Sequence, residues 1–130
     1  GGLLSYGNDM TRENTPHECG LGRFCNTATA IGCIGRDALL RVAKEGPVRQ
    51  IRSLAIDGGP VPPCREVWPV TAEDGERVGQ VTSAAWSPDF QTNAAIGMIR
   101  MTHWKPGTRV TVETPEGPRA ATVRAEFFTQ

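Results

Sequence analysis

The chain has 130 residues, of which 38% are hydrophobic and 22% are charged, and its 14 basic residues balance 14 acidic ones. This composition excludes a disordered chain, which would combine low hydrophobicity with high net charge. A net charge of zero argues against a module that binds nucleic acid or an anionic membrane. No apolar run reaches the roughly 20 residues of a transmembrane helix. The length fits one domain, or one domain with part of a neighbour.

Residues 1–46 are predicted to be irregular apart from one helix. Apolar residues recur at spacings of three and four between Ala38 and Lys44, which is typical of an amphipathic helix. Asp37 suits the positive N-terminal end of this helix, and Gly46-Pro47 would end it. Its apolar face is expected to carry Leu39, Val42 and Ala43.

Residues 47–130 are predicted to be all-β. The segment Arg49–Ile56 alternates imperfectly, as a strand would, and Asp74-Gly75 and Pro115-Glu116-Gly117 are typical turns of two hairpins. The apolar segment Ala94–Met101 indicates either a strand buried on both faces or a short helix. Five or six short strands predict a mainly β fold, a small Greek-key-like barrel that leaves no exposed edge.

Side-chain alternation in the last hairpin predicts which residues face the barrel core. Val110 and Val112 share one face of the first strand. In the first strand of the other hairpin, Pro69 indicates an edge position, because proline has no N–H to donate. The same reasoning turns four residues of the last strand inward: Ala121, Val123, Ala125 and Phe127.

Four cysteines stand at positions 19, 25, 33 and 64. Their gaps do not form the Cys-x-x-Cys pairs of a zinc site, and no export signal indicates an oxidising compartment. We therefore expect free thiols that act as small core residues. Two disulfides are the first alternative and a metal site the second.

Several motifs in register resemble the glycine-cleavage T-protein superfamily, and together they cover essentially the whole chain. Gly79-Gln80-Val81-Thr82-Ser83 followed by Ser87-Pro88 is similar to the G-x-V-T-S…S-P signature of that family. The other matching runs are Tyr6-Gly7-Asn8-Asp9, Thr15-Pro16 with Glu18, Gly20 and Leu21, and Ile34-Gly35-Arg36 with Ala38 and Leu39.

The resemblance is strongest to the branch of this family that demethylates dimethylsulfoniopropionate. Two long runs carry that preference, Gly2–Thr11 and Glu18–Cys25. The implied reaction moves a methyl group from a sulfonium sulfur to N5 of tetrahydrofolate. Family members begin with a long N-terminal region that holds the acidic residue facing the folate, so the resemblance implies a C-terminal fragment that is inactive by itself. It divides the chain into a remnant of the folate-binding α/β domain (1–46) and the barrel domain (47–130).

The resemblance places no catalytic residue in this chain and implies that its partners are a small-molecule substrate and the N-terminal region of its own chain. Tyr6 matches a family tyrosine near the folate, so its phenol is a candidate hydrogen-bond partner of the cofactor. Arg124 is a candidate contact for the glutamate tail of the folate. Trp86, just after the Thr-Ser run, is a candidate substrate contact, although packing in the barrel core or as a seal is the simpler interpretation for Trp86, as for Trp68 and Trp104.

Other polar residues have simpler structural interpretations. Asp9 is predicted to stabilise a turn, and Glu18 to form a local salt bridge or cap the following turn. His17 and His103 lack a second ligand at metal-binding spacing, so both are predicted surface residues. Thr82-Ser83 is assigned to turn formation and barrel packing, because no nucleophile elbow surrounds it.

Two other functions remain open from the sequence. One is an aminomethyltransferase, or a related one-carbon transferase that produces methylenetetrahydrofolate. The other is a non-catalytic structural or interaction barrel. The absence of a signal peptide and of an apolar span predicts a cytoplasmic protein without a membrane or nucleic-acid partner.

Overall fold

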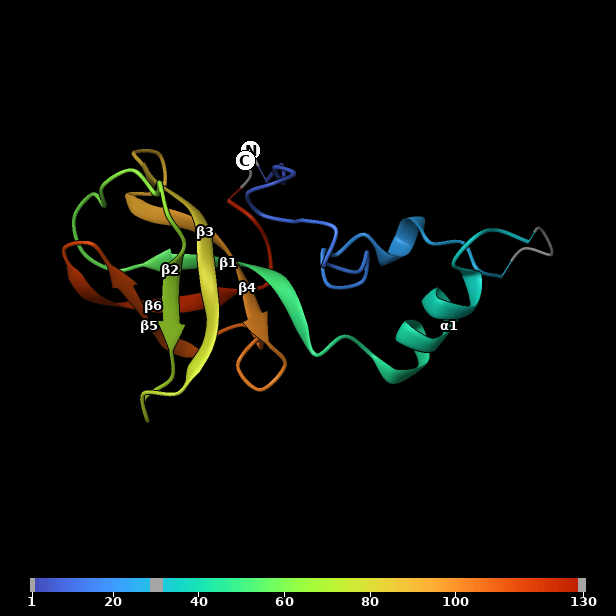
Figure 1. The fold of residues 1–130 in the computed structure, drawn as a ribbon. Coiled ribbons are helices and arrows are strands. Elements are labelled where there is room, and N and C mark those ends of the chain that lie inside the picture. Colours follow the sequence, from blue (N-terminus) through green and yellow to red (C-terminus); the bar gives the residue numbers. More distant parts are fainter. Residues whose placement is uncertain (1, 29–31, 129–130) are drawn as a thin grey trace.

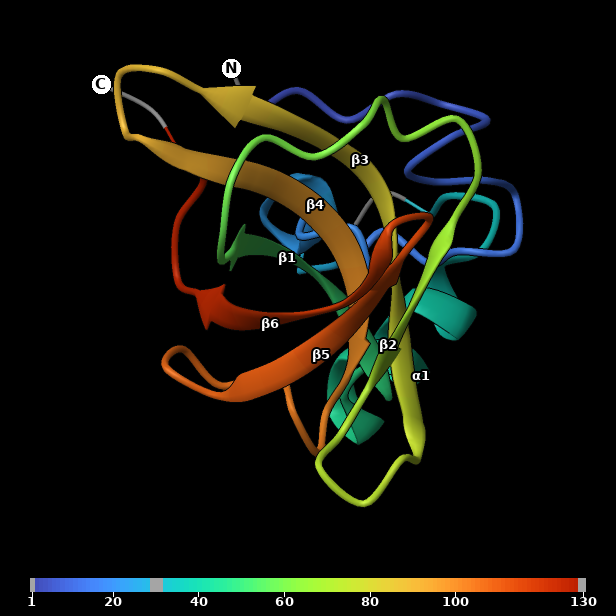
Figure 2. The same ribbon diagram turned by 90° about the vertical axis from the view of Figure 1, so that its left-hand side faces the viewer.

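The computed structural model describes residues 2–28 and 32–128. Six antiparallel strands close into a barrel in the order β1, β4, β3, β2, β5, β6, and β6 pairs back onto β1. Figure 2 shows the strands wrapped around a common interior. The predicted six-stranded barrel is therefore confirmed. The strands are β1 (Arg49–Ile56), β2 (Trp68–Thr71), β3 (Arg77–Ser87), β4 (Thr92–Arg100), β5 (Arg109–Thr114) and β6 (Gly117–Arg124).

Both predicted hairpins are present. β2 and β3 pair across the Asp74-Gly75 turn, where Gly75 has a φ of 82° that favours glycine. β5 and β6 pair up to Thr114 and Gly117, which leaves only Pro115 and Glu116 as the turn between them. Pro69 lies in β2 opposite Gln80, where it pairs with β3 alone, because β5 pairs only with the next two residues. Proline is thus tolerated where no second ladder requires its N–H.

The segment predicted as a doubly buried strand or a short helix is strand β4. Its first half alternates, with Asn93 and Ala95 buried and their neighbours partly exposed. Only Gly97, Met98 and Ile99 are buried in succession. Met98 lies on the outer face of β4, where it lines a hollow together with residues of the N-terminal segment. Because the N-terminal segment lies over this outer face, Met98 is buried as well, and the alternation of buried and partly exposed residues ends here.

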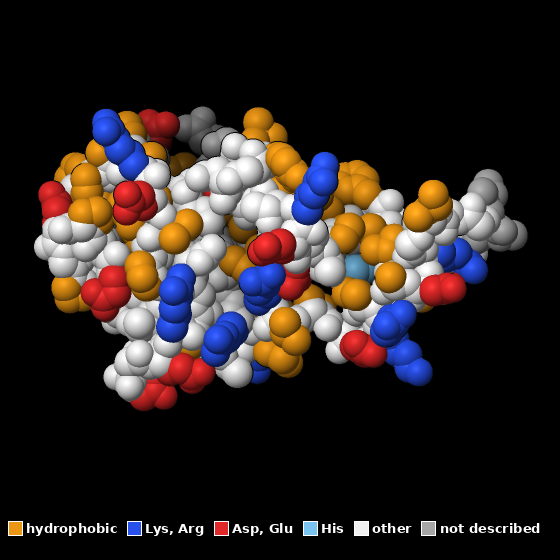
Figure 3. All heavy atoms as spheres, in the orientation of Figure 1, with side chains coloured by type: hydrophobic (Ala, Val, Ile, Leu, Met, Phe, Trp, Pro, Cys, Tyr) orange, Lys and Arg blue, Asp and Glu red, His pale blue; other side chains and the backbone are white. Residues whose placement is uncertain are grey.

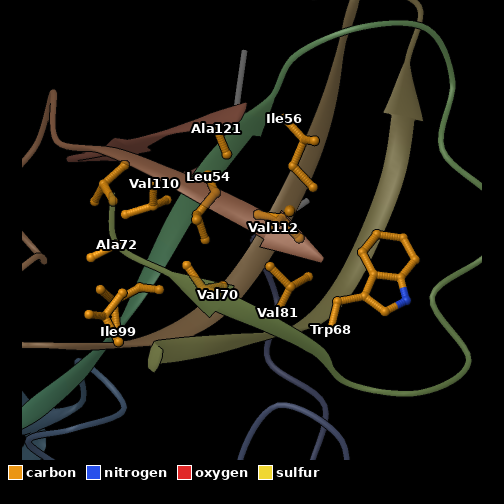
Figure 4. Packing of buried hydrophobic residues seen from close by; sticks show 13 residues of the cluster. Leu54, Ile56, Trp68, Val70, Ala72, Val81, Ile99, Val110, Val112 and Ala121 are labelled. Carbon is orange, nitrogen blue, oxygen red and sulfur yellow. The ribbon is translucent and has the colours of Figure 1, made fainter. Parts of the chain in front are cut away.

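The barrel interior holds the hydrophobic core. Leu54, Val70 and Val112 have no exposed surface, and Figure 4 shows them pointing toward one another inside the barrel. The predicted inward residues Val110, Ala121 and Val123 are also buried. Burying a side chain of this size contributes about 1.5–3 kcal/mol. The barrel therefore has a core of its own.

Two predictions about side-chain burial are wrong. Ala125 is exposed, because β6 ends at Arg124 and the alternation stops with the strand. Trp86 is 36% exposed near the end of β3, so the core alternative of its predicted core or seal role is wrong, whereas Trp68 is buried and Trp104 packs partly against the core. Pro88 directly follows the last residue of β3, as predicted for a strand end.

The N-terminal segment runs beside the barrel and contains little regular structure (Figure 1). A short 3-10 helix covers Gly22–Phe24, and α1 covers Arg36–Glu45, where the sequence predicts a helix. α1 projects away from the barrel and buries none of its residues, and Ala43 on its predicted apolar face is exposed. The outer bounds of the two predicted domains, Gly1 and Gln130, lie outside the described residues. The division between residues 46 and 47 stays a prediction.

Candidate functional site

Asp9 is a buried carboxylate in a tight turn formed by residues 5–10. Its exposed fraction is 5%, and its Oδ2 accepts a 2.8 Å hydrogen bond from the backbone N–H of Ser5. The Asp9 N–H donates back to the Ser5 carbonyl at 2.8 Å, and the Gly7 N–H donates to the Met10 carbonyl at 2.8 Å. The predicted turn role of Asp9 is therefore confirmed.

A β-bulge in β3 provides the other partners of Asp9. Val81 pairs with Gly97 and Ser83 pairs with Ile96, so Thr82 is an extra residue between them. A bulge re-aims side chains that would otherwise alternate across the strand. As a result the hydroxyls of both Thr82 and Ser83 reach Asp9 Oδ1, at 2.6 Å and 2.7 Å.

Asn8 completes a four-residue group, which we call the Asp9 cluster (Asn8, Asp9, Thr82 and Ser83). The Asn8 amide donates to the Thr82 carbonyl at 3.0 Å and to the Ser83 hydroxyl at 2.8 Å. Hydrogen bonds to an ionised carboxylate are shorter and stronger than neutral ones. The cluster therefore fixes the turn of residues 5–10 to the outer face of the barrel. Sequence reasoning assigned Thr82 and Ser83 only to turn and packing roles and missed this contact.

Glu18 forms a second connection between the N-terminal segment and the barrel. Thr15 and Glu18 exchange hydrogen bonds, with the Thr15 N–H donating to Glu18 Oε2 at 2.8 Å and the Glu18 N–H donating to the Thr15 hydroxyl at 3.3 Å. Glu18 Oε1 accepts from Arg49 Nε at 2.9 Å, and the Glu18 carbonyl accepts from the Ile51 N–H at 2.7 Å. Glu18 therefore forms a salt bridge, but with a partner 31 residues away rather than a local one, and it caps the turn that precedes it rather than the following turn.

The three residues that the sequence proposes for ligand contact do not converge. Tyr6 is 66% exposed on the turn that the Asp9 cluster holds. Trp86 lies near the end of β3, and the Arg124 guanidinium lies 3.8 Å from the centre of the Phe128 ring. None of the three lines the hollows of about 290, 230 and 600 Å³ that residues of the N-terminal segment and the barrel form. Their roles therefore stay predictions.

The two histidines are less exposed than the sequence predicts, because both are half-buried. His17 Nε2 is buried without a hydrogen-bond partner, and a side chain on Gly22 would contact its ring. Pro16 and Glu18, on either side of His17, belong to the turn that packs on β1. The close approach of Gly22 contributes to the burial of the histidine ring.

All four cysteines are free thiols, but only some of them contribute to the core. Cys19 is buried, Cys64 packs against the barrel core and Cys33 is exposed. Burial raises the pKa of the Cys19 thiol, and the nearby Glu18 carboxylate raises it further. Burial also raises the pKa of the Cys64 thiol, with a smaller contribution from Asp9. Residues 2–28 and 32–128 contain no group of three or more side chains suited to hold a metal ion.

Three hollows are lined by described residues of both the N-terminal segment and the barrel. The polar one, of about 290 Å³, lies at one end of β3 and β4 and is lined by Asn8, Asp9 and several arginines. The apolar one, of about 600 Å³, lies between residues 2–23 and β1. The small one, of about 230 Å³, shares Ser53 and Phe127 with the apolar hollow. Figure 3 shows hydrophobic side chains gathered over the N-terminal segment beside the barrel.

A pterin ring carries several ring nitrogens and needs matching buried polar partners. The carboxylate of Asp9 in the polar hollow is already bound by Ser5, Thr82 and Ser83. The apolar hollow offers a single buried hydroxyl, that of Ser53. Both buried carboxylates of the described residues, those of Asp9 and Glu18, are thus already bound by protein donors. No helix among the described residues is long and apolar enough to cross a membrane.

The fold and the Asp9 cluster define a closed six-stranded barrel bound to a preceding irregular segment. Residues 49–129 match the glycine cleavage T-protein C-terminal barrel domain, and the chain belongs to that family. The chain is 60% identical over 127 residues to the dimethylsulfoniopropionate demethylase DmdA of Ruegeria pomeroyi, covering 98% of this chain and 34% of that protein. It is 36% identical to an aminomethyltransferase of a Synechococcus species, covering 95% and 33%.

A solved structure agrees with these sequence matches. The crystal structure of the glycine cleavage system aminomethyltransferase T from Bartonella henselae superposes with a TM-score of 0.79 at 27% identity. The match covers 95% of this chain and 34% of that one. The chain thus spans about a third of the length of the relatives it matches.

Proposed function

We propose that this chain is the C-terminal part of a tetrahydrofolate-dependent methyltransferase. In this proposal the enzyme demethylates dimethylsulfoniopropionate to methylmercaptopropionate and forms 5-methyltetrahydrofolate. The observation that carries the proposal is the contrast between 60% identity to the demethylase and 36% to the aminomethyltransferase, each over nearly the whole chain.

The proposed reaction needs little covalent chemistry from the protein. The bond between the methyl carbon and the sulfonium sulfur breaks, and sulfur keeps the electron pair as a neutral thioether. The methyl carbon bonds to N5 of the folate, and N5 loses its proton to solvent or a nearby base. Because the leaving group is already good, the main requirement is orientation, which can supply about 7–11 kcal/mol.

In this proposal the chain contributes a rigid wall rather than the reacting groups. The Asp9 cluster holds the turn that carries Tyr6, so the exposed phenol of Tyr6 is presented at a fixed position for a hydrogen bond to the folate. Contacts of Arg124 with the folate tail and of Trp86 with the substrate belong to the same proposal. The region that corresponds to the other two thirds of the relatives supplies the reactive centre, and the present chain alone is inactive. A cytoplasmic location is part of the proposal.

The experiment is an assay of the protein with its upstream region. With dimethylsulfoniopropionate and tetrahydrofolate, methylmercaptopropionate should form. With an aminomethylated carrier protein and tetrahydrofolate, no methylenetetrahydrofolate should form. The reverse pattern would favour the aminomethyltransferase function. No turnover with either donor would favour a non-catalytic barrel.

A further inference from the structure

The segment Ala125–Phe128 leaves the barrel after β6 and lies against the start of the chain. The pairing of β6 with β1 ends at Arg124, so no strand ladder holds the residues that follow. Phe127 is half-buried, and a Cβ built on Gly2 would lie 3.2 Å from the Phe127 Cβ, so the two residues are in close contact. Figure 1 shows the segment after β6 (red) turning up beside the first part of the chain (dark blue).

Phe127 lies at the boundary between two hollows on the outside of the barrel. It lines both the apolar hollow of about 600 Å³ and the small hollow of about 230 Å³. Gly2 also lines both hollows, so its contact with Phe127 lies where the two hollows meet. Leu4 lines the apolar hollow and is half-buried. The start of the chain therefore rests on the outer surface of the barrel through Gly2 and Leu4.

Residues 5–8 form an exposed stretch between two anchored points of the chain. Before this stretch, Gly2 is in close contact with Phe127. After it, the Asp9 cluster fixes the chain to β3. Tyr6 belongs to the exposed stretch and is itself 66% exposed. The direction of its phenol therefore depends on how firmly the chain is held on both sides.

We propose that Phe127 is a positioning residue for the Tyr6 phenol, an inference that rests on the proposed contact between Tyr6 and the folate. Phe127 fixes the chain before the turn, and the Asp9 cluster fixes it after the turn. Without the Phe127 ring, residues 2–4 would lose their support, and the turn would be held on one side only. A hydrogen bond weakens steeply as its angle departs from linearity, so a turn that is free to tilt would present the phenol poorly. Phe127 thus acts through Tyr6.

The first test observes the turn itself and needs neither folate nor the upstream region. In ¹⁵N relaxation of the 130-residue chain, the Tyr6 amide should have an order parameter near the rigid value of about 0.85, and Phe127→Ala should lower it toward the flexible range below about 0.6. Phe128→Ala is the matched control, because the three atoms nearest to the Cβ position of Gly2 all belong to Phe127. A Tyr6 amide that is flexible in the unsubstituted chain, that keeps its order in Phe127→Ala, or that loses it equally in both variants would overturn the proposal.

The second test measures tetrahydrofolate binding by calorimetry in the protein with its upstream region. Phe127→Ala should weaken binding by about two- to tenfold, no more than the loss of the Tyr6 hydrogen bond itself. Phe127→Leu keeps an apolar contact with Gly2 and should restore most of the affinity. In the Tyr6→Phe background, Phe127→Ala should cause no further loss, because its effect passes through the phenol, and additive losses would contradict the positioning role. If the unsubstituted protein binds no tetrahydrofolate, the proposed function fails, and the relaxation measurement still decides whether Phe127 holds the turn.

Discussion

The carboxylate of Asp9 accepts a 2.6 Å hydrogen bond from the hydroxyl of Thr82, 73 positions later in the chain. This contact is buried, and it joins a turn of the N-terminal segment to a bulge of the barrel. The two parts of the chain are therefore positioned by a charged hydrogen-bond group rather than by apolar packing alone. The following predictions test this arrangement and the function that we propose for it.

Asp9→Asn should destabilise the chain by about 1.5–3 kcal/mol, the contribution of hydrogen bonds to a charged group. The asparagine would lose the charge, and its amide N–H₂ would either face the Ser5 N–H, donor against donor, or require both hydroxyls to accept instead of donate. Urea unfolding measures the difference. Glu13→Gln is the control, because Glu13 is exposed and its carboxylate forms no ion pair, so its effect should stay within about 0.5 kcal/mol. Equal stability of the two variants would contradict the role of Asp9.

Gly97→Ala should destabilise the barrel by about 1–3 kcal/mol, the usual cost of overpacking. A Cβ at Gly97 would lie 2.5 Å from the Gln80 carbonyl oxygen, which is backbone and cannot move aside cheaply. Gly59→Ala is the matched control, since nothing lies within 4 Å of its Cβ position. Thermal unfolding of the two variants should differ by several degrees. A Gly97→Ala variant as stable as Gly59→Ala would show that β3 and β4 are less closely packed.

The cysteines should react with iodoacetamide in the order of their burial. Cys33 is exposed and should be alkylated first, whereas Cys19 and Cys64 should react slowly. Because burial raises the pKa of both thiols, they stay protonated to higher pH than a free thiol, and protonated thiols are poor nucleophiles. Peptide mass spectrometry after labelling at several pH values measures the order. Labelling of Cys19 as fast as that of Cys33 at neutral pH would contradict this placement.

Tyr6→Phe, made in the protein with its upstream region, should weaken tetrahydrofolate binding by about 0.5–1.5 kcal/mol, the net contribution of one hydrogen bond. The exposed phenol has no hydrogen-bond partner of its own among the described residues, so folding should not change. Calorimetric titration with tetrahydrofolate checks both the affinity and the folded fraction. An unchanged affinity would remove Tyr6 from the folate site.

The barrel could be predicted from the sequence because its signals are local. Asp74-Gly75 and Pro115-Glu116-Gly117 mark tight turns, and alternation around Val110 and Val123 identifies the core face. The alternation gave a wrong answer at Ala125, because nothing in the local pattern shows where pairing with β1 ends. The exposure of Trp86 was missed for a similar reason. Trp86 lies next to the end of β3, and the sequence does not show how far that strand extends.

The Asp9 cluster was beyond sequence reasoning for a different reason. Its partners are far apart in the chain, and Thr82 reaches Asp9 only because a bulge changes the direction of its side chain. A Thr-Ser pair has no local feature that indicates a bulge. The only available signal in the sequence was the presence of two adjacent polar pairs, Asn8-Asp9 and Thr82-Ser83. The predicted contacts of Tyr6 depend on groups outside this chain and could not be placed from it.

The most direct measurement of the proposed function follows the methyl group itself. The protein with its upstream region is incubated with tetrahydrofolate and dimethylsulfoniopropionate that carries ¹³C in its S-methyl groups, and the products are observed by NMR. The proposal predicts that the label appears in the N5-methyl group of 5-methyltetrahydrofolate, in an amount equal to the methylmercaptopropionate formed. Label that stays on sulfur, or that appears in any carrier other than the folate, would contradict it.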